Sequence, residues 1–458
     1  MSQSDSIHAI SAVDGRYRSK VDALASICSE FGLMKYRTEV ECRWVAFLGD
    51  LTTIAEMPAL GDDDKQFVNE LIANFDEAAA LRIKQFEATT NHDVKAVEYY
   101  VKERFNERDT LAPLSEWIHF ACTSEDINNT AYGLMVKAAI AEVLMPHIDT
   151  LIAAIEDLAS AHSARPMLSR THGQTASPTT LGKEMKNVAV RLQRQRSQLS
   201  QIEIMGKFNG AVGNFNAHLS AYPSVDWIQV SGDFIRSLGL TNNPWTTQIE
   251  PHDYLAEIFH CLMRLNQILL DFDRDIWAYI SNDYFKQIKV EGETGSSTMP
   301  HKINPIDFEN SEGNVGIANA LLAHMAEKLP VSRWQRDLSD STVLRNIGNA
   351  FAHCAIAYQA TVKGLSRLDV NSDVIAADLA QSWEVLAEPV QTVMRKYGIA
   401  EPYEKLKAAT RGRRLSAPLF AELLTELQLP EAAVAELRDL TPDNYIGVAT
   451  ALAEKPFD

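Results

Sequence analysis

The chain has 458 residues, enough for roughly two to four domains with ample core. Hydrophobic residues make up 46% and charged residues 23%, the composition of an ordinary soluble globular protein. Lysine and arginine number 43 against 61 aspartates and glutamates, and the formal net charge of -18 argues against a general binder of nucleic acid or acidic membranes. A small anionic substrate remains compatible, because a pocket can be locally basic on an acidic protein.

Cysteine and histidine spacing predicts no metal site. The five cysteines are odd in number and widely spaced, and neither a Cys-x-x-Cys pair, a Cys/His zinc spacing nor an HExxH motif occurs. We therefore expect reduced, partly buried thiols. The first residues lack the basic and apolar regions of a secretory signal, and no apolar run approaches the ~18 residues of a membrane span. The sequence thus predicts a cytoplasmic protein without a membrane partner.

The first quarter of the chain is predicted to be helical with polar interruptions. Arg16 and Tyr17 follow a glycine turn, so the arginine is either a solvated charge or a clamp for phosphate. The segment 89–95 opens a helix, with its hydroxyls and Asn91 expected as N-caps. A helix N-terminus also binds anions, with Lys95 about one turn inside, and both interpretations stay open.

Long helices are predicted from about residue 113 to about residue 365. Apolar side chains recur at three- and four-residue spacing from 181 to 202, after Ser177 and Pro178 as N-cap and first-turn proline. The segment 253–291 contains neither glycine nor proline. It therefore predicts one helix of about 38 residues, about 57 Å long. A third apolar stripe runs from 343 to 365. Because no comparably long alternating run occurs, we expect an all-α fold built on a central bundle of long helices.

An unusual loop is predicted before the helix that begins near Asp307. Glycines at 292 and 295 bracket it, three hydroxyl residues follow, and two prolines then enclose a lysine and an asparagine. Such a segment is neither a helix interior nor a central strand. It is an ordered loop of functional importance or, alternatively, a surface connector.

The sequence pattern changes after about Ser366, where prolines become more frequent. They divide this part of the chain into short helices, which predicts a smaller C-terminal domain. The expected domains are therefore residues 1–111, 112–365 and 366–458. The basic cluster Arg411-Gly412-Arg413-Arg414 is interpreted as a solvated or inter-subunit face rather than a nucleic-acid patch.

The loop 295–305, GSSTMPHKINP, resembles the signature loop of the fumarase/aspartase superfamily, and His301 is similar to the adenylosuccinate lyase form of that loop. The runs 170–174 (RTHGQ) and 90–93 (TNHD) agree with it, and the resemblance covers nearly the whole chain. It implies a three-domain all-α fold that assembles as a homotetramer with sites shared between chains. It also implies release of fumarate from adenylosuccinate to give AMP, and from the succinyl-carboxamide ribotide SAICAR to give AICAR, without a cofactor.

The same resemblance assigns the catalytic residues. Ser296 matches the base that removes a carbon proton, His172 the acid that protonates the leaving nitrogen, and Glu309 the carboxylate that orients this histidine. A near-neutral reference pKa suits a histidine for proton delivery. Taken alone, these residues could equally be a turn hydroxyl, a structural histidine and a first-turn glutamate stabilised by the helix dipole.

Substrate binding is assigned in the same way, to residues expected to gather cationic and amide donors around one phosphate and two carboxylates. They are Arg16, Tyr17, Asn91, His92, Asp93, Lys95, Thr123, Ser124, Gln248, Ser297, Lys302, Ile303, Asn304, Asn310, Arg336, Ser341, Thr342, Val343, Leu344 and Arg345. Arg336 and Arg345 flank a polar interruption that is either a phosphate clamp or a solvated loop. The alternative functions are a sibling such as argininosuccinate lyase or aspartase, and a non-catalytic structural paralogue.

Overall fold

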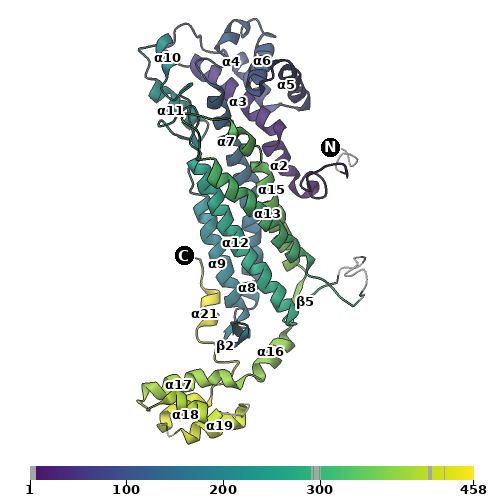
Figure 1. Cartoon of the computed structure of the whole chain (residues 1–458), viewed down its shortest axis with the longest axis vertical. Helices are drawn as coiled ribbons and strands as arrows, with labels where there is room; N and C mark the ends of the chain where they lie inside the picture. Colours follow the sequence, from purple (N-terminus) through teal and green to yellow (C-terminus); the bar gives the residue numbers. More distant parts are fainter. Residues whose placement is uncertain are drawn as a thin grey trace. The chain divides into compact units, whose positions relative to one another are not determined.

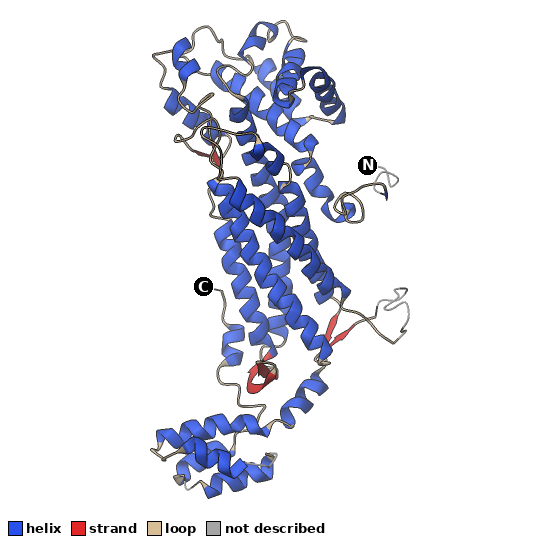
Figure 2. Cartoon of the chain, in the orientation of Figure 1, coloured by secondary structure: helices blue, strands red, loops and turns tan. Residues whose placement is uncertain are grey.

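The computed structural model describes residues 7–289, 292, 299, 301–410, 415–427 and 429–457, and of residues 409 and 410 the backbone only. Helices make up most of the described chain and the strands are short (Figure 2). The all-α fold class predicted from the sequence is therefore confirmed. The basic cluster at 411–414 lies outside the described residues.

The chain divides into two compact units. Unit 1 comprises Met1–Ile148, Gln195–Gln267 and Gly313–Tyr358, and unit 2 comprises Asp149–Arg194, Ile268–Glu312 and Gln359–Asp458. The expected boundaries at 111/112 and 365/366 of a three-domain chain stay a prediction.

The elements of unit 1 are mainly helices of moderate length. They are α2 (Arg18–Cys28), α3 (Glu30–Gly49), α4 (Asp62–Ala73), α5 (Glu77–Thr90), α6 (Asp93–Phe105), η1 (Ala112–Trp117), α7 (Ser124–Ala139), η2 (Ile140–Leu144), β3 (Met205–Gly206), α10 (Asn216–Ala221), α11 (Trp227–Ser237), β4 (Thr241–Asn242) and α14 (Ser339–Leu344). Longer helices have residues in both units: α8 (Met145–Ala161), α9 (Leu181–Leu199), α12 (Asp253–Ser281), α13 (Ile306–Lys328) and α15 (Ile347–Leu365).

Unit 2 adds two short two-stranded sheets and the short C-terminal helices. Its elements are β1 (Pro166–Thr171), β2 (Gln174–Thr180), β5 (Phe285–Gln287), β6 (Leu368–Val370), α16 (Ser372–Ala380), η3 (Trp383–Leu386), α17 (Ala387–Lys396), α18 (Pro402–Thr410), α19 (Ala417–Glu426), α20 (Glu431–Arg438) and α21 (Ala449–Glu454). Both sheets are antiparallel, and β1 and β2 form a hairpin. Pro402 begins α18 and Pro418 lies in the first turn of α19, as the proline spacing predicted.

The core of unit 1 forms around Trp44 on α3, which is fully buried. Its ring lies 4.6 Å from that of Phe208 and 4.9 Å from that of Phe234. Helices α3 and α6 pack side by side in this unit (Figure 1). The indole Nε1 also donates a 3.1 Å hydrogen bond to the carbonyl of Phe120. The core therefore fixes the segment just before α7, where predicted site residues lie.

One predicted helix is too long. Helix α12 spans 29 residues and ends at Ser281, whereas the sequence predicted helix up to residue 291. Asp283 adopts a left-handed φ of 58°, and β5 follows. Aspartate tolerates this conformation better than most residues, because its short polar side chain can hydrogen-bond locally. The chain therefore turns out of the helix without glycine or proline, the signals on which the prediction depended.

One helical segment is long and apolar by composition. Ser124–Ala161, which contains α7, η2 and α8, has an 18-residue window of mean hydropathy 1.6, although the sequence was expected to contain no such run. Core helices of soluble proteins pass the same test, and 44% of this window is buried inside the chain. Asp126 and Asn129 of this segment are buried and hydrogen-bonded to the protein. We therefore interpret it as a bundle helix.

Candidate active site

The predicted anion site at the start of α6 is capped by a histidine. Nδ1 of His92 accepts a 3.2 Å hydrogen bond from the backbone N–H of Lys95. Asn91 has a left-handed φ of 50° and ends α5 instead. The prediction that Asn91 and the preceding hydroxyls cap α6 was therefore wrong. The αL residue between two helices gives a tight turn, and this turn places His92 and Asp93 together at the exposed helix end.

Asp93 lies between two guanidinium groups. Its Oδ2 is 2.9 Å from Nη2 of Arg37 and 2.8 Å from Nη2 of Arg345. Burial by itself would raise the pKa of Asp93, but the two arginines, Arg37 foremost, lower it to about 2. The predicted residues Asp93 and Arg345 are thus brought together. Arg37 was missed by the sequence analysis, since a lone arginine within an amphipathic helix carries no signal.

Thr123 and Ser124 begin α7, where a buried ion pair holds the backbone. Asp126 and Lys207 are both fully buried, with Nζ 2.9 Å from Oδ1. The Asp126 carboxylate also accepts hydrogen bonds from the backbone N–H groups of Thr123, Asn209 and Gly210. A carboxylate with this many donors is satisfied although it is buried. The pair therefore fixes the start of α7 against the segment 207–210.

Gln248 and Arg336 are also brought together. Nη1 of Arg336 donates to Oε1 of Gln248 at 3.2 Å, and Nε2 of Gln248 donates to the carbonyl of Ala211 at 3.0 Å. Nη2 of Arg336 lies 2.9 Å from Oε1 of Glu125, a buried carboxylate. Among the described residues, no acceptor contacts the buried Nε–H of Arg336. The Arg336 guanidinium is therefore held by one carboxylate and one amide, with its Nε–H left unpaired inside the described part of the chain.

Three predicted cations of unit 1 have carboxylate partners. Arg345 pairs with Asp93, Arg336 with Glu125, and Lys95 with Glu98, whose Oε1 lies 2.8 Å from the lysine Nζ. An anion that binds any of these cations must therefore exchange with, or add to, an existing carboxylate contact. A cluster held in this way is ordered before the ligand arrives.

The remaining predicted residues of unit 1 lie near the N-terminal helix and α14. Arg16 is exposed, Tyr17 immediately precedes α2, and Ser341 to Leu344 belong to α14. An open cavity of about 560 Å³ lies against α2, and Arg18 and Arg345 are in its wall. Of the predicted residues, Leu344 and Arg345 line this cavity.

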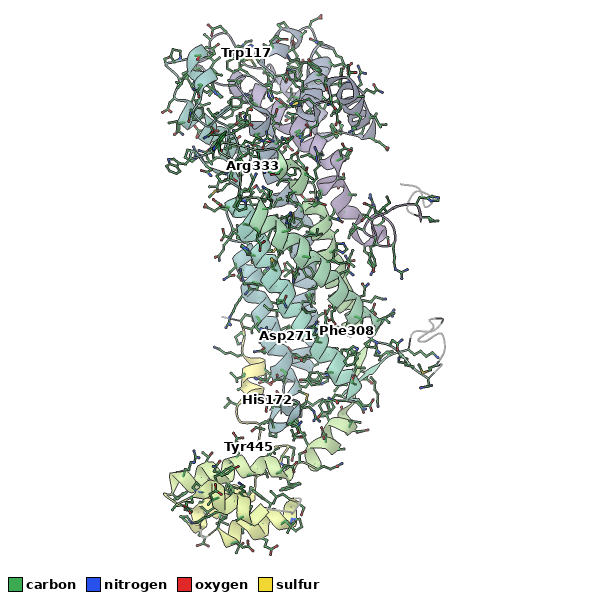
Figure 3. All side chains as sticks on the ribbon, viewed as in Figure 1. Trp117, His172, Asp271, Phe308, Arg333 and Tyr445 are labelled. Carbon is green, nitrogen blue, oxygen red and sulfur yellow. The ribbon has the colours of Figure 1, made fainter. Side chains whose placement is uncertain are left out.

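His172 occupies the tip of the β1–β2 hairpin in unit 2 (Figure 3). Thr171 pairs with Gln174, so His172 and Gly173 form a two-residue turn with φ of 54° and 73°. Two residues with positive φ are typical of the tight turns that suit a hairpin. The sequence analysis expected a helix with Ser177 as its N-cap and Pro178 in its first turn. That was wrong, because 174–180 form the second strand and α9 begins at Leu181.

Two carboxylates hold this hairpin. Nη2 of Arg170 lies 2.6 Å from Oδ2 of Asp378 on α16, and the hydroxyl of Tyr284 donates to the same oxygen. Burial and this hydrogen bond raise the pKa of Tyr284 to about 12, so the phenol stays a donor at neutral pH. On the other strand, the Ser177 hydroxyl donates to Glu388. The exposed histidine is therefore presented on an anchored hairpin.

The start of α13 carries the other predicted residues of unit 2. Oε1 of Glu309 accepts a 3.2 Å hydrogen bond from the indole of Trp277. Lys302 is exposed, Asn304 and Asn310 are half-buried, and the carbonyl of Ile303 accepts from Gln287 at 2.8 Å. The contact between Glu309 and His172 stays a prediction. Ser296 and Ser297 lie outside the described residues, as does most of the loop that contains them.

Metal-ligating side chains do not gather into a cluster in the described part of the chain. No group of three or more histidine, cysteine, aspartate or glutamate side chains there could hold a metal ion. All five cysteines are free thiols. What the residues of unit 1 offer is a set of arginines, amides and hydroxyls for an anionic ligand, and unit 2 offers an exposed imidazole for proton transfer.

Comparison with known proteins decides the family. Residues 15–318 match the family described as Lyase, and residues 332–446 match the one described as Adenylosuccinate lyase C-terminal. Adenylosuccinate lyase of Escherichia coli strain K12 is 57% identical over 450 residues, which is 98% of this chain and 99% of that protein. Adenylosuccinate lyase of Vibrio cholerae is 58% identical over 448 residues, 98% of each chain. The chain belongs to the adenylosuccinate lyase family.

A solved structure supports the fold of this lyase. The crystal structure of a fumarate lyase from Mesorhizobium matches with a TM-score of 0.73 at 20% identity, over 94% of this chain and 96% of that one. At this identity the likeness concerns the fold alone. The fumarase/aspartase assignment made from the loop, the RTHGQ run and the TNHD run is confirmed by the family matches.

Proposed function

We propose that this chain is an adenylosuccinate lyase, which releases fumarate from adenylosuccinate to give AMP. The observation that carries the proposal is 57% identity, over 98% of the chain, to a relative of that name. By the same family membership, SAICAR is a second substrate and gives AICAR. The reaction needs acid–base groups and no cofactor.

The reaction is a β-elimination in which each group has one task. Ser296, deprotonated to the alkoxide, takes the proton from the carbon next to a carboxylate and becomes the neutral hydroxyl. The electrons of that C–H bond form the new double bond of fumarate as the C–N bond breaks with its electron pair on nitrogen, and His172 protonates that nitrogen. The hairpin supports this role because it exposes the imidazole while both of its strands are anchored.

Substrate charge is proposed to be held mainly by unit 1. Arg336 and Arg345 bind the phosphate, with Gln248 and the start of α7 beside them; the ordered pairs of each arginine with a carboxylate support this. Lys302 and Asn304 bind carboxylates of the succinyl group. Charge that accumulates on a carboxylate in the transition state is stabilised by such fixed donors.

Self-association as a homotetramer with shared sites is part of the proposal. Trp277 and Ile317 are about half exposed in the single chain. Such apolar helix surface is typical of a face that another subunit covers. If an active preparation sediments as a monomer, the tetramer proposal is refuted. A cytoplasmic location is proposed from the metabolic role, and fractionation of cells tests it.

One side-by-side assay separates the candidate functions. Fumarate release is measured from adenylosuccinate, SAICAR, argininosuccinate and aspartate. Turnover of the first two alone supports the proposal, turnover of argininosuccinate or aspartate favours a sibling lyase, and no turnover favours a structural paralogue. Ser296→Ala is then expected to lower kcat by at least ~10²-fold, the low end for positioned acid–base groups. A small effect would assign the base elsewhere.

A further inference from the structure

A continuous chain of side chains joins the two arginines proposed to bind phosphate. It begins at Arg345, whose Nη2 lies 2.8 Å from Oδ2 of Asp93. The same carboxylate oxygen lies 2.9 Å from Nη2 of Arg37 on α3. One oxygen of Asp93 is therefore shared between a half-exposed guanidinium and a buried one.

The chain continues from Arg37 to the second arginine. Nε of Arg37 donates to Oδ1 of Asn128 at 2.8 Å, and Nδ2 of Asn128 donates to Oε1 of Glu125 at 2.7 Å. That same oxygen of Glu125 lies 2.9 Å from Nη2 of Arg336. Four side chains from three helices thus connect Arg345 to Arg336, although Arg37 and Asn128 belong to no motif in the sequence.

Arg37 has no access to a ligand of its own. Only 3% of this residue is exposed, and the two groups described above occupy its Nε and Nη2. Buried arginines persist where their charge is paired, and this one faces Asp93. Any influence of Arg37 on an anion must therefore pass through its partners.

Charge in this part of unit 1 is balanced. The three arginines face three carboxylates: Asp93, Glu125 and Asp340, whose Oδ1 lies 3.9 Å from Nη2 of Arg336. Loss of one arginine leaves an excess of negative charge beside the anion site. Asp93 would then hold Arg345 alone, and the guanidinium of Arg345 would be drawn toward it.

We propose, resting on the proposed function, that Arg37 and Asn128 are positioning residues that set how Arg336 and Arg345 present their guanidinium groups to the substrate phosphate. Arg37 shares the charge of Asp93, so that Arg345 stays available. Asn128 ties this pair to the Glu125–Arg336 pair, so that the spacing of the two arginines is fixed before substrate binds.

The test uses the full-length enzyme with three variants. Arg37→Met removes the buried charge. Arg37→Lys keeps a positive charge, but an ammonium lacks the rigid, planar pair of donors with which a guanidinium can bind Asp93 and Asn128 together. Asn128→Ala removes the hydrogen bonds that connect Arg37 to Glu125 while leaving every charge in place. Arg82→Met is the matched control, because Arg82 forms a close ion pair with Glu103 in the same unit but outside this chain of contacts. Calorimetry measures affinity for AMP and for adenosine, which lacks the phosphate, and kinetics give kcat and KM.

A phosphate-specific loss is expected. Arg37→Met should weaken AMP binding by about ten-fold, equivalent to about 1.4 kcal/mol, with adenosine affinity unchanged. KM for adenylosuccinate should rise by a similar factor, while kcat stays within about two-fold of the wild-type value. This combination indicates that the ground state and the transition state lose the same amount of binding energy. Asn128→Ala should show about a three-fold loss, Arg37→Lys an intermediate one, and Arg82→Met none.

Each other outcome has a definite meaning. Wild-type enzyme that neither turns over adenylosuccinate nor binds AMP refutes the proposed function itself. Wild-type activity with unchanged AMP affinity in Asn128→Ala and Arg37→Met overturns this inference only. Equal losses for AMP and adenosine would show a general distortion and overturn it as well. If Arg37→Met does not fold, Asn128→Ala and Arg37→Lys decide.

Discussion

The anchoring of the hairpin that carries the proposed acid His172 can be tested by Asp378→Ala. This substitution removes the carboxylate that accepts from both Arg170 and Tyr284, and it leaves His172 and its turn unchanged in sequence. The hairpin keeps its second anchor, the hydrogen bond from Ser177 to Glu388. We therefore expect a hairpin that folds but holds its tip less firmly.

The structure predicts a small effect on stability and a large one on rate. Side chains of Arg170 and Asp378 are 31% and 33% exposed, so solvent screens this ion pair. Loss of the pair together with the hydrogen bond from Tyr284 should therefore cost about 1–2 kcal/mol. The midpoint Tm should then fall by about 2 °C or less. Displacing a catalytic group by about 1 Å can cost about 10²-fold in rate, so kcat should fall by about ten- to one hundred-fold.

Steady-state kinetics with adenylosuccinate and thermal unfolding at one protein concentration check both numbers. Asp271→Ala is the control, because Asp271 pairs with Arg191 at 2.9 Å in the same unit, away from the hairpin. It should lower Tm as little as Asp378→Ala does and leave kcat unchanged. The reasoning is refuted if Asp378→Ala keeps the wild-type kcat, or if its loss of activity is matched by the control.

Three further predictions concern unit 1. Lys207→Met leaves the fully buried Asp126 without its counter-charge and should cost about 3 kcal/mol in urea unfolding; a cost below about 0.5 kcal/mol contradicts the buried pair. Burial would lower the pKa of His119, but Glu41, 2.7 Å from its Nδ1, raises it above the ordinary value. The stabilisation is therefore complete below about pH 6.5 and is lost as pH rises through the raised pKa, and Glu41→Gln should abolish this pH dependence of Tm. Gly213→Ala should lower both Tm and affinity for AMP. Gly213 has a φ of 81°, and an added Cβ would meet a backbone carbonyl oxygen at 2.4 Å. Wild-type values of both quantities would show that the backbone around residue 213 can shift to accept the Cβ, and would contradict the prediction.

The helices were predictable because their signal is local. Apolar residues at three- and four-residue spacing indicated the bundle helices, and α13 begins at Ile306, one residue from the predicted start. The predicted helix boundaries were wrong where hydrogen bonds and residues with left-handed φ determine the direction of the backbone. Asp283 turns the chain just after the end of α12, Asn91 ends α5, and the turn at His172 folds its flanks into a hairpin.

The motifs in the sequence determined the family, and they supplied most of the polar residues proposed for the site. Contiguous runs such as RTHGQ and GSSTMPHKINP identify a lyase because their residues act together and are adjacent along the chain. Only the tertiary structure revealed Arg37 and Asp378. Asp378 is 208 positions from the Arg170 it holds, and Arg37 is 91 positions from Asn128. Such contacts follow from how the helices pack, and side-chain packing between distant segments leaves no periodic or motif-like trace in a single sequence.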